Sequence, residues 1–164
     1  MIAHVVIPED RIKKLRHEKG WDVELGRFFD VSVAIAEDVV IEGEDVVQVL
    51  NVKEIYKAFG RGFDFSECMD LVDDEYLLLV INIKDFAGSG KRETVMKGRI
   101  IGEMGGMKKQ IEKSAQVKVA VYGKTVSIIG RPENILVAEE AIKMILFGSK
   151  HNKVYRFLAE HKVV

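Results

Sequence analysis

A diverged internal repeat constrains the fold of this 164-residue chain more than any other feature. Alternating apolar segments at residues 31–35 and 117–121 lie 86 residues apart, and each predicts a β-strand. A second short strand is predicted after each of them, at residues 39–42 and 125–129. Because each repeat has about 80 residues, which is enough for a small domain, the pattern predicts two similar domains.

A helix is predicted after the second strand of each copy. In the first copy Asp45 and Gln48 have the spacing of a capping box, and apolar residues then recur at helical intervals up to Gly60, which is expected to supply a left-handed stop. In the second copy Pro132 suits the first helical turn and Gly148 is expected to end the helix. The two helices share a Phe-Gly ending, which favours a true repeat over coincidence.

A strand and a pair of helices are predicted ahead of these segments in each half. The expected elements are strands at residues 4–7 and 76–83 and helix pairs at residues 11–29 and 91–114, broken at Gly20 and at residues 102–106. Each half therefore reads βααββα. The prediction is an α+β fold of two tandem domains, residues 1–75 and 76–164, each with helices on one face of a three-stranded sheet.

The break in the second helix pair has the sequence Gly102-Glu103-Met104-Gly105. A turn this tight needs residues without a Cβ, both for its dihedral angles and to let another backbone approach. The helix that follows offers unpaired amide groups and the positive end of its dipole, which suits phosphate oxygens. Lys108 and Lys109 lie in its first turns, and Arg99 just precedes the break. A Gly-x-x-Gly segment is a weak signal alone, but within a βααββα unit it is a strong one.

The two halves of the chain carry opposite net charge. Residues 1–88 contain 10 Lys and Arg against 19 Asp and Glu, whereas residues 89–164 contain 15 against 7. This asymmetry suggests that one half meets a polyanion, although the two halves could also pair with each other. The single cysteine, Cys68, excludes a disulfide framework and a thiolate-rich zinc site, and no metal is expected.

The second half resembles a KH domain, in which a Gly-x-x-Gly loop clamps about four single-stranded nucleotides against an apolar groove. Nearly the whole chain is similar to the archaeal and eukaryotic two-KH proteins of small-subunit ribosome assembly. These are the partner-of-Nob proteins, which are related to the KRR-type rRNA processing factors. The matching stretches are IPEDRI (7–12), AFGRGF (58–63), KGRIIG (97–102), VYGKTVSIIG (121–130) and KVYRFL (153–158).

The resemblance implies two tandem type I KH domains that bind single-stranded RNA without catalysis. The implied target is the 3′ end region of small-subunit ribosomal RNA during ribosome maturation. The implied protein partners are the Nob endonuclease and the alpha subunit of archaeal translation initiation factor two. No cofactor and no membrane contact are expected, and the expected location is the cytoplasm.

The residues expected to bind RNA have three roles. Two glycines open the loop around Glu103 and Met104, basic residues supply charge, and apolar residues form the floor of the groove. The full set is Arg99, Ile100, Ile101, Gly102, Glu103, Met104, Gly105, Lys108, Lys109, Val119, Val121 and Arg156.

Two departures from the KH pattern affect the expected affinity. The first half has His17-Glu18-Lys19-Gly20, in which a histidine replaces the leading glycine. Because a side chain there should obstruct phosphate, the first domain is expected to be a structural or protein-binding module rather than a second clamp. In the second loop the Glu103 carboxylate opposes phosphate, which should weaken binding.

Several alternatives stay open. The target could instead be messenger RNA or single-stranded DNA, or the chain could be a protein-interaction scaffold that works through its acidic half. Gly88-Ser89-Gly90-Lys91 is similar to part of a P-loop, but Asp85 and Arg92 occupy positions where that motif needs Gly and Ser or Thr. In residues 150–162, Tyr155 or Phe157 could stack on a base. The same segment could equally form a helix that docks on the sheet or the other domain.

Overall fold

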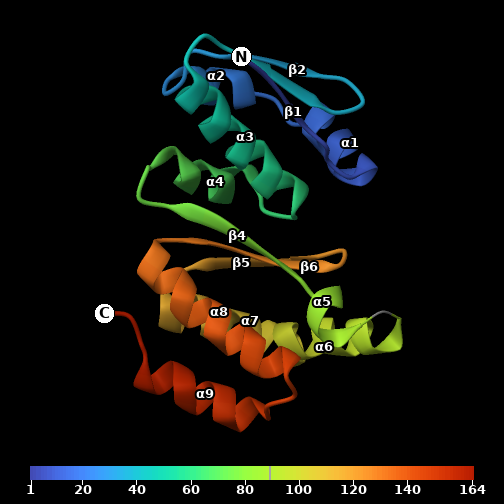
Figure 1. Cartoon of the computed structure of the whole chain (residues 1–164), viewed down its shortest axis with the longest axis vertical. Helices are drawn as coiled ribbons and strands as arrows, with labels where there is room; N and C mark the ends of the chain where they lie inside the picture. The colour runs from blue at the N-terminus through green and yellow to red at the C-terminus, as the bar shows by residue number, and fades with distance from the viewer. Residues whose placement is uncertain (89) are drawn as a thin grey trace. The chain divides into compact units, whose positions relative to one another are not determined.

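The computed structural model describes residues 1–88 and 90–164, and the chain divides into two compact units, Met1–Asp74 and Glu75–Val164 (Figure 1). Unit 1 contains three strands, four α-helices and one 3₁₀ turn. In chain order these are β1 (Ile2–Val5), α1 (Glu9–His17), α2 (Trp21–Gly26), β2 (Ser32–Ile35), β3 (Val39–Glu42), α3 (Val46–Gly60), α4 (Phe65–Cys68) and η1 (Met69–Val72).

Unit 2 repeats the order of the strands and main helices, adds the short elements α5 and η2 before its second strand, and ends in a longer C-terminal helix. Its elements are β4 (Leu77–Asn82), α5 (Lys84–Ala87), α6 (Lys91–Ile101), η2 (Glu103–Gly105), α7 (Gly106–Ala115), β5 (Lys118–Tyr122), β6 (Thr125–Gly130), α8 (Pro132–Leu146) and α9 (His151–Glu160). Each unit has one antiparallel three-stranded sheet, with strand orders β1-β3-β2 and β4-β6-β5. The predicted α+β fold class is therefore confirmed, and the repeat extends to the same strand pairing in both units.

The core of unit 1 forms between β3 and α3. Val39 and Ile41 alternate on the inner face of the central strand, and the predicted stripe of α3 is fully buried. Trp21 on α2 completes this core, because its ring stacks on Tyr56 at 5.0 Å and meets Phe59 edge-on at 5.1 Å. The apolar periodicity in the sequence thus identifies the residues that close the core.

The two Phe-Gly segments end their helices differently, which corrects one prediction. Gly148 has a φ of +95°, and the amides of Gly148 and Ser149 donate to Ile145 O and Met144 O, as in a Schellman motif. Gly60 instead remains helical, and the left-handed residue is Gly62, with a φ of +102°. Gly60 is closely packed for a different reason, since a Cβ there would lie 3.2 Å from the Ile7 side chain.

The start of α3 confirms one half of the expected capping box. Asp45 accepts a hydrogen bond from Val47 N at 2.9 Å, as an N-cap residue should. The Gln48 side chain does not return to the Asp45 amide but accepts from Asp30 N at 2.7 Å. Gln48 therefore ties the α2–β2 connection to the start of α3, a tertiary contact that local spacing does not predict.

The C-terminal segment forms a helix that packs on other helices. Val154 and Leu158 are fully buried, and α9 lies along α7 and α8 on their side away from the sheet (Figure 1). Within unit 2 it therefore docks on helices rather than on the sheet. Within the P-loop-like segment, Ser89 lies outside the described residues, while Gly88 and Gly90 both have positive φ.

The predicted strand boundaries differ from the structure by one or two residues at most. The first strand begins at Ile2 rather than at residue 4, because Ile2 pairs with Glu42 at the end of β3. No helix among the described residues combines the length and apolar character that crossing a membrane requires.

Candidate nucleic-acid interface

The Gly-x-x-Gly segment of unit 2 forms a tight turn that needs both glycines. Gly102 has a φ of +77°, and a Cβ on it would lie 2.7 Å from both Cβ and N of Met107. Gly105 has a φ of +75° and begins α7. Its amide donates to Gly102 O at 3.1 Å, which closes the turn. At Gly102 close packing against Met107 leaves no room for a side chain, whereas at Gly105 a side chain could be accommodated.

The tip of this turn projects into solvent. Met104 has a left-handed φ of +53° and is 91% exposed, and Glu103 beside it is exposed as well. A left-handed conformation is unusual for methionine and costs free energy. The loop therefore holds a strained shape that keeps its backbone accessible.

The start of α7 is an open site for an anion. Among the described residues, no side chain caps this helix, and its N-terminal end presents the positive end of the helix dipole. The Gly106 amide donates to Glu103 O within the turn. Met107 and Ile111 are fully buried and hold the helix in place. Lys109 is exposed, and its Cε lies 3.8 Å from where a Gly105 Cβ would be. Fixed amides and a lysine therefore converge beside the loop, which suits a phosphate group.

Lys108 is held by a network that the sequence analysis missed. Its Nζ lies 3.9 Å from Glu112 Oε1, and Glu112 Oε2 accepts a hydrogen bond from Val119 N in β5 at 3.1 Å. The four-residue spacing of Lys108 and Glu112 could have indicated the ion pair. The contact with the strand could not be inferred, because it depends on how α7 packs on β5.

Arg99 lies next to the loop but has a structural role. Its guanidinium donates to Ile145 O at 3.3 Å and to Ser149 O, both at the C-terminal end of α8. Its own carbonyl oxygen is hydrogen-bonded to His151 Nε2 at 2.9 Å. Arg99 thus links α6 to the end of α8 and the start of α9 by hydrogen bonds, and it holds in place the end of α6 that leads into the loop.

The apolar residues expected in the groove fall into two groups, which corrects the prediction for two of them. Ile100 and Val119 are fully buried in the core of unit 2 and cannot contact a ligand. Ile101 is exposed at the end of α6, and Val121 on β5 is half-buried. Helical and strand alternation indicates that neighbouring residues face opposite ways, but only packing shows which one faces the core. Arg156 is exposed on α9, outside the loop.

The corresponding turn of unit 1 differs in both shape and charge. Gly20 keeps a positive φ of +97°, but the helix it begins, α2, has only six residues. The Glu18 carboxylate in the turn accepts a hydrogen bond from Trp21 Nε1 at 3.0 Å. Arg16 spans from α1 to Ala36 O in the β2–β3 turn. The carboxylate of Glu18 is therefore held within its turn, whereas Glu103, at the corresponding position of unit 2, is exposed.

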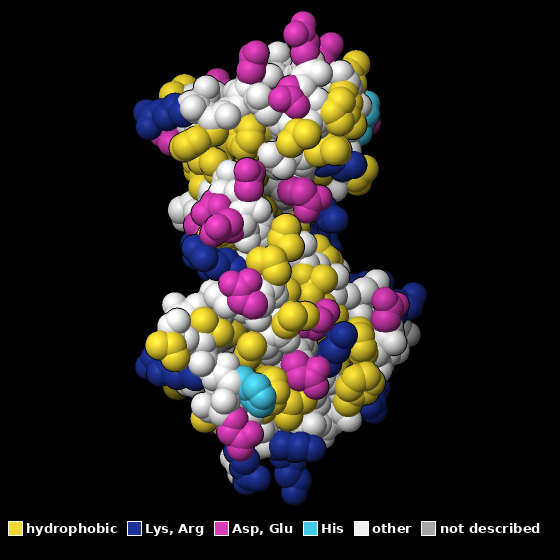
Figure 2. Space-filling model, turned by 60° about the vertical axis from the view of Figure 1, so that its left-hand side comes forward, with side chains coloured by type: hydrophobic (Ala, Val, Ile, Leu, Met, Phe, Trp, Pro, Cys, Tyr) yellow, Lys and Arg dark blue, Asp and Glu magenta, His cyan; other side chains and the backbone are white. Residues whose placement is uncertain are grey.

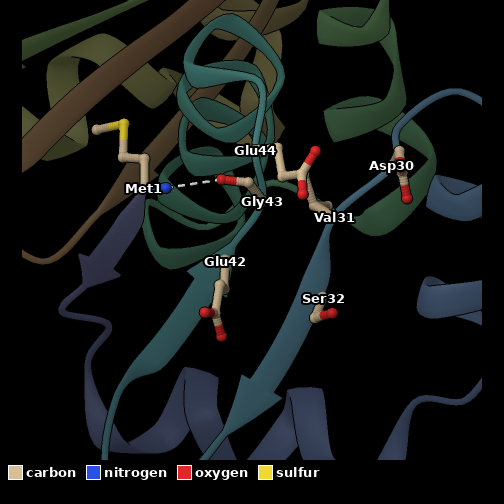
Figure 3. A pocket seen from close by; sticks show the side chains of 7 residues that line it. All are labelled: Met1, Asp30, Val31, Ser32, Glu42, Gly43 and Glu44. Atoms are coloured by element: carbon tan, nitrogen blue, oxygen red, sulfur yellow. Dashed lines mark hydrogen bonds between the residues drawn. The ribbon is translucent and has the colours of Figure 1, made fainter.

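Two pockets lie in unit 1, and acidic residues border both. One has a volume of about 220 Å³ and is lined by Leu15, Glu18, Trp21, Asp22, Val33, Ile35 and Tyr56. The other has a volume of about 350 Å³ and is lined by Met1, Asp30, Val31, Ser32, Glu42, Gly43 and Glu44 (Figure 3). In the second pocket the Met1 ammonium donates to Gly43 O at 2.7 Å, so one wall is fixed by the chain terminus.

Neither pocket is suited to a phosphate group, because carboxylates stand around each opening. Among the residues that the structure describes, no group of three or more His, Cys, Asp or Glu side chains is placed to hold a metal ion.

The acidic and basic side chains on the surface gather in different places (Figure 2). Asp and Glu side chains gather over unit 1, and Lys and Arg side chains stand at the α9 end of unit 2. The phosphate-binding geometry is therefore a property of unit 2.

Comparison with protein families identifies the fold of unit 2. Residues 77–163 match a model for the second KH domain of PNO1 proteins, described as a eukaryotic type KH domain, KH-domain type I. A KH domain-containing protein of Methanocaldococcus jannaschii is 38% identical over 167 residues, which cover 95% of this chain and 72% of that protein. The whole chain, not only unit 2, therefore has a relative of similar organisation.

A eukaryotic relative matches over a shorter region. The pre-rRNA-processing protein pno1 of Aspergillus oryzae is 31% identical over 106 residues, which cover 63% of this chain but only 41% of that protein. The structure is also similar to the aDim2p chain of a Pyrococcus horikoshii complex that contains a/eIF2alpha and rRNA. The TM-score is 0.87 and the identity 34%, over 98% of this chain and 93% of that chain.

Proposed function

Because this chain belongs to the PNO1 family of KH-domain proteins, we propose that it binds single-stranded RNA and acts in the maturation of ribosomal RNA. The proposed target is the 3′ end region of small-subunit ribosomal RNA. One observation carries the proposal: no side chain caps the start of α7, where the Gly102–Gly105 turn places the positive end of the helix dipole next to Lys109. The crystallised complex of a related aDim2p with rRNA supports it.

Each residue of the proposed clamp has a distinct role. Gly102 and Gly105 shape the turn, and the first amides of α7 bind a phosphate, as is general for KH loops. Lys108 and Lys109 supply positive charge on either side of this site. Ile101 and Val121 form the accessible apolar floor, while Ile100, Val119 and Arg99 support it from within.

We propose a different role for unit 1. It repeats the KH strand order, but His17 stands at the position of the first glycine, and the helix after the turn, α2, has only six residues. Its residues 1–74 contain 9 Lys and Arg against 17 Asp and Glu. A second candidate function follows from this charge, in which unit 1 binds a basic protein. The alpha subunit of initiation factor two, which is present in the related complex, and the Nob endonuclease are the proposed partners.

A binding titration tests the proposed target. We expect an oligonucleotide with the 3′ end sequence of small-subunit ribosomal RNA to bind more tightly than a scrambled oligonucleotide of the same composition. Each phosphate that is neutralised should add about −0.7 to the slope of log affinity against log salt. Equal affinity for both oligonucleotides would contradict sequence recognition and leave only general attraction to unit 2.

Replacing Glu103 by lysine should tighten RNA binding. Glu103 is exposed in the turn, so its carboxylate repels a phosphate bound at the start of α7. We expect an affinity gain of about 5- to 20-fold at low salt, falling as salt screens the charges. Glu140→Lys, which makes the same charge change at an exposed site on α8, is the control for a general charge effect. An equal gain in both variants would argue that the turn does not face phosphate.

A further inference from the structure

The C-terminal helix α9 begins next to the proposed RNA clamp. His151, its first residue, is hydrogen-bonded through Nε2 to Arg99 O at 2.9 Å. Arg99 is three residues before Gly102, and its guanidinium also binds Ser149 O just ahead of α9. Two hydrogen bonds therefore fix the start of this helix to the end of α6, beside the turn.

From this point α9 follows α7 away from the turn. Val154 and Leu158 are buried against the helices of unit 2. Beyond the end of α9, Val163 N donates to Ser114 O near the end of α7 at 2.8 Å. The start of α9 thus lies near the start of α7, and the end of α9 lies near the end of α7. The two helices therefore run in the same direction. At 1.5 Å per residue, the ten residues of α9 extend about 15 Å.

The solvent side of α9 combines positive charge with an aromatic ring. Lys153 and Arg156 are exposed and three residues apart, so they share one face of the helix. Tyr155 is 39% exposed, and its ring meets His151 edge-on at a centroid distance of 6.4 Å. Lys150 is exposed at the start of the helix. The Lys and Arg side chains at this end of unit 2 are visible in Figure 2.

We propose that α9 binds the RNA strand beyond the nucleotides held at the turn. Lys150, Lys153 and Arg156 contact successive phosphates, and Tyr155 stacks on one base. Single-stranded nucleic acid is commonly bound by positive side chains that track the backbone together with an aromatic ring that stacks on a base. At 3.4 Å per phosphate of a stacked strand, 15 Å corresponds to about four phosphates. This inference rests on the proposed RNA-binding function and extends its site.

The continuity with the turn favours RNA over an acidic protein as the partner of α9. A strand that leaves the start of α7 and follows α9 reaches Lys150 and Lys153 without crossing an acidic side chain on this helix. Glu160 is the one acidic residue of the helix, and it lies in the last turn, at the end far from the clamp. An acidic protein is the alternative outcome of the test below.

The test compares short and long oligonucleotides. One labelled RNA has four nucleotides, and two ten-nucleotide RNAs contain the same four with six added on the 5′ or on the 3′ side. For the Lys153→Glu/Arg156→Glu variant we expect the affinity for one of the two ten-nucleotide RNAs to fall about 30-fold. The salt slope should fall by about 1.4 in magnitude, since two phosphate contacts are lost. Tyr155→Ala should lower the affinity for that ten-nucleotide RNA alone by about fivefold. Affinity for the four-mer and for the other ten-mer should stay within about twofold.

Two controls separate the possible outcomes. Lys84→Glu/Arg92→Glu makes the same charge change at exposed sites on α5 and the far end of α6, and it should leave both ten-mers nearly unaffected. Circular dichroism checks that the α9 variant is folded. Normal ten-mer binding by the α9 variant would overturn the inference and point to an acidic protein partner. Equal losses with all three RNAs would also overturn it. If the unaltered protein binds none of the RNAs, the proposed function itself fails.

Discussion

Gly105→Asp should lower the affinity for single-stranded RNA by about 100-fold, whereas Gly105→Asn should lower it only about threefold. The aspartate would place a negative charge at the start of α7, where we propose that phosphate binds. Two like charges about 4 Å apart near a protein surface repel by up to about 4 kcal/mol, and salt reduces this to the expected effect. Asparagine has nearly the same shape and carries no charge, so the pair of variants isolates electrostatics.

Gly105 is a better position for this test than Gly102. Both glycines have positive φ, which Asn and Asp tolerate better than other residues. A Cβ on Gly102 would collide with the Met107 backbone at 2.7 Å, so any substitution there would deform the turn. A Cβ on Gly105 would meet only Lys109 Cε at 3.8 Å. Loss of RNA binding in Gly105→Asp can therefore be assigned to charge.

Fluorescence anisotropy with a labelled oligonucleotide measures both Gly105 variants. Their thermal unfolding curves should overlap, because the two side chains have similar size and backbone preference. If Gly105→Asn loses as much affinity as Gly105→Asp, the turn is sensitive to shape rather than charge. If neither loses affinity, the start of α7 does not bind phosphate and the clamp assignment fails.

Arg11→Ala should destabilise unit 1 by about 3 kcal/mol, through the loss of hydrogen bonds to a buried charged group and of packing. Arg11 is only 8% exposed. Its Nε donates to Phe59 O at 2.9 Å and its NH2 group to Phe63 O at 2.7 Å. The guanidinium also lies 4.2 Å from the centre of the Phe59 ring. Removing it leaves one carbonyl oxygen at the end of α3 and one in the connection that follows without this donor, in a buried environment.

The single tryptophan makes the stability of unit 1 measurable. Trp21 is buried against Tyr56 and Phe59, so its fluorescence should change when this core opens. Urea titration should show a lower midpoint for Arg11→Ala than for the unaltered protein. Arg11→Lys should also be less stable, by about 2 kcal/mol, since an ammonium cannot reproduce the planar bridge between two carbonyls.

Lys13→Ala is the matched control for Arg11→Ala. Lys13 is an exposed residue on the same helix, and its Nζ lies 3.6 Å from Glu9 in a surface ion pair. Such pairs contribute about 0–1 kcal/mol, so this variant should unfold close to the unaltered protein. An unchanged midpoint for Arg11→Ala would mean that the buried bridge does not contribute to the stability of unit 1.

The sequence predicted the features that depend on local pattern. Strand alternation located β3 with its observed bounds, and the glycine spacing located the turn between α6 and α7. The capping role of Asp45 and the left-handed Gly148 followed from the known preferences of helix ends. These features arise from interactions within a few residues, which the sequence records directly.

The errors concern residues whose role depends on a neighbour distant in the sequence. For Arg99 the sequence predicted a phosphate contact, and it did not predict the hydrogen bonds to carbonyl groups more than 45 residues away. Gly60 looked like a helix stop, but its importance is the close approach of Ile7. Ile100 and Val119 are apolar, as residues on the floor of a groove would be, but they lie in the core. Helical periodicity places residues on a face, and it does not say what covers that face.

The contact between Glu112 and Val119 has a consequence for self-association. β5 is an edge strand, and unpaired amides on such a strand can recruit a strand from another molecule. The Glu112 carboxylate occupies the outward Val119 amide, so this part of the edge is already hydrogen-bonded. Glu112, which forms the ion pair with Lys108, therefore also protects this part of β5 from pairing with a strand of another molecule and from aggregation.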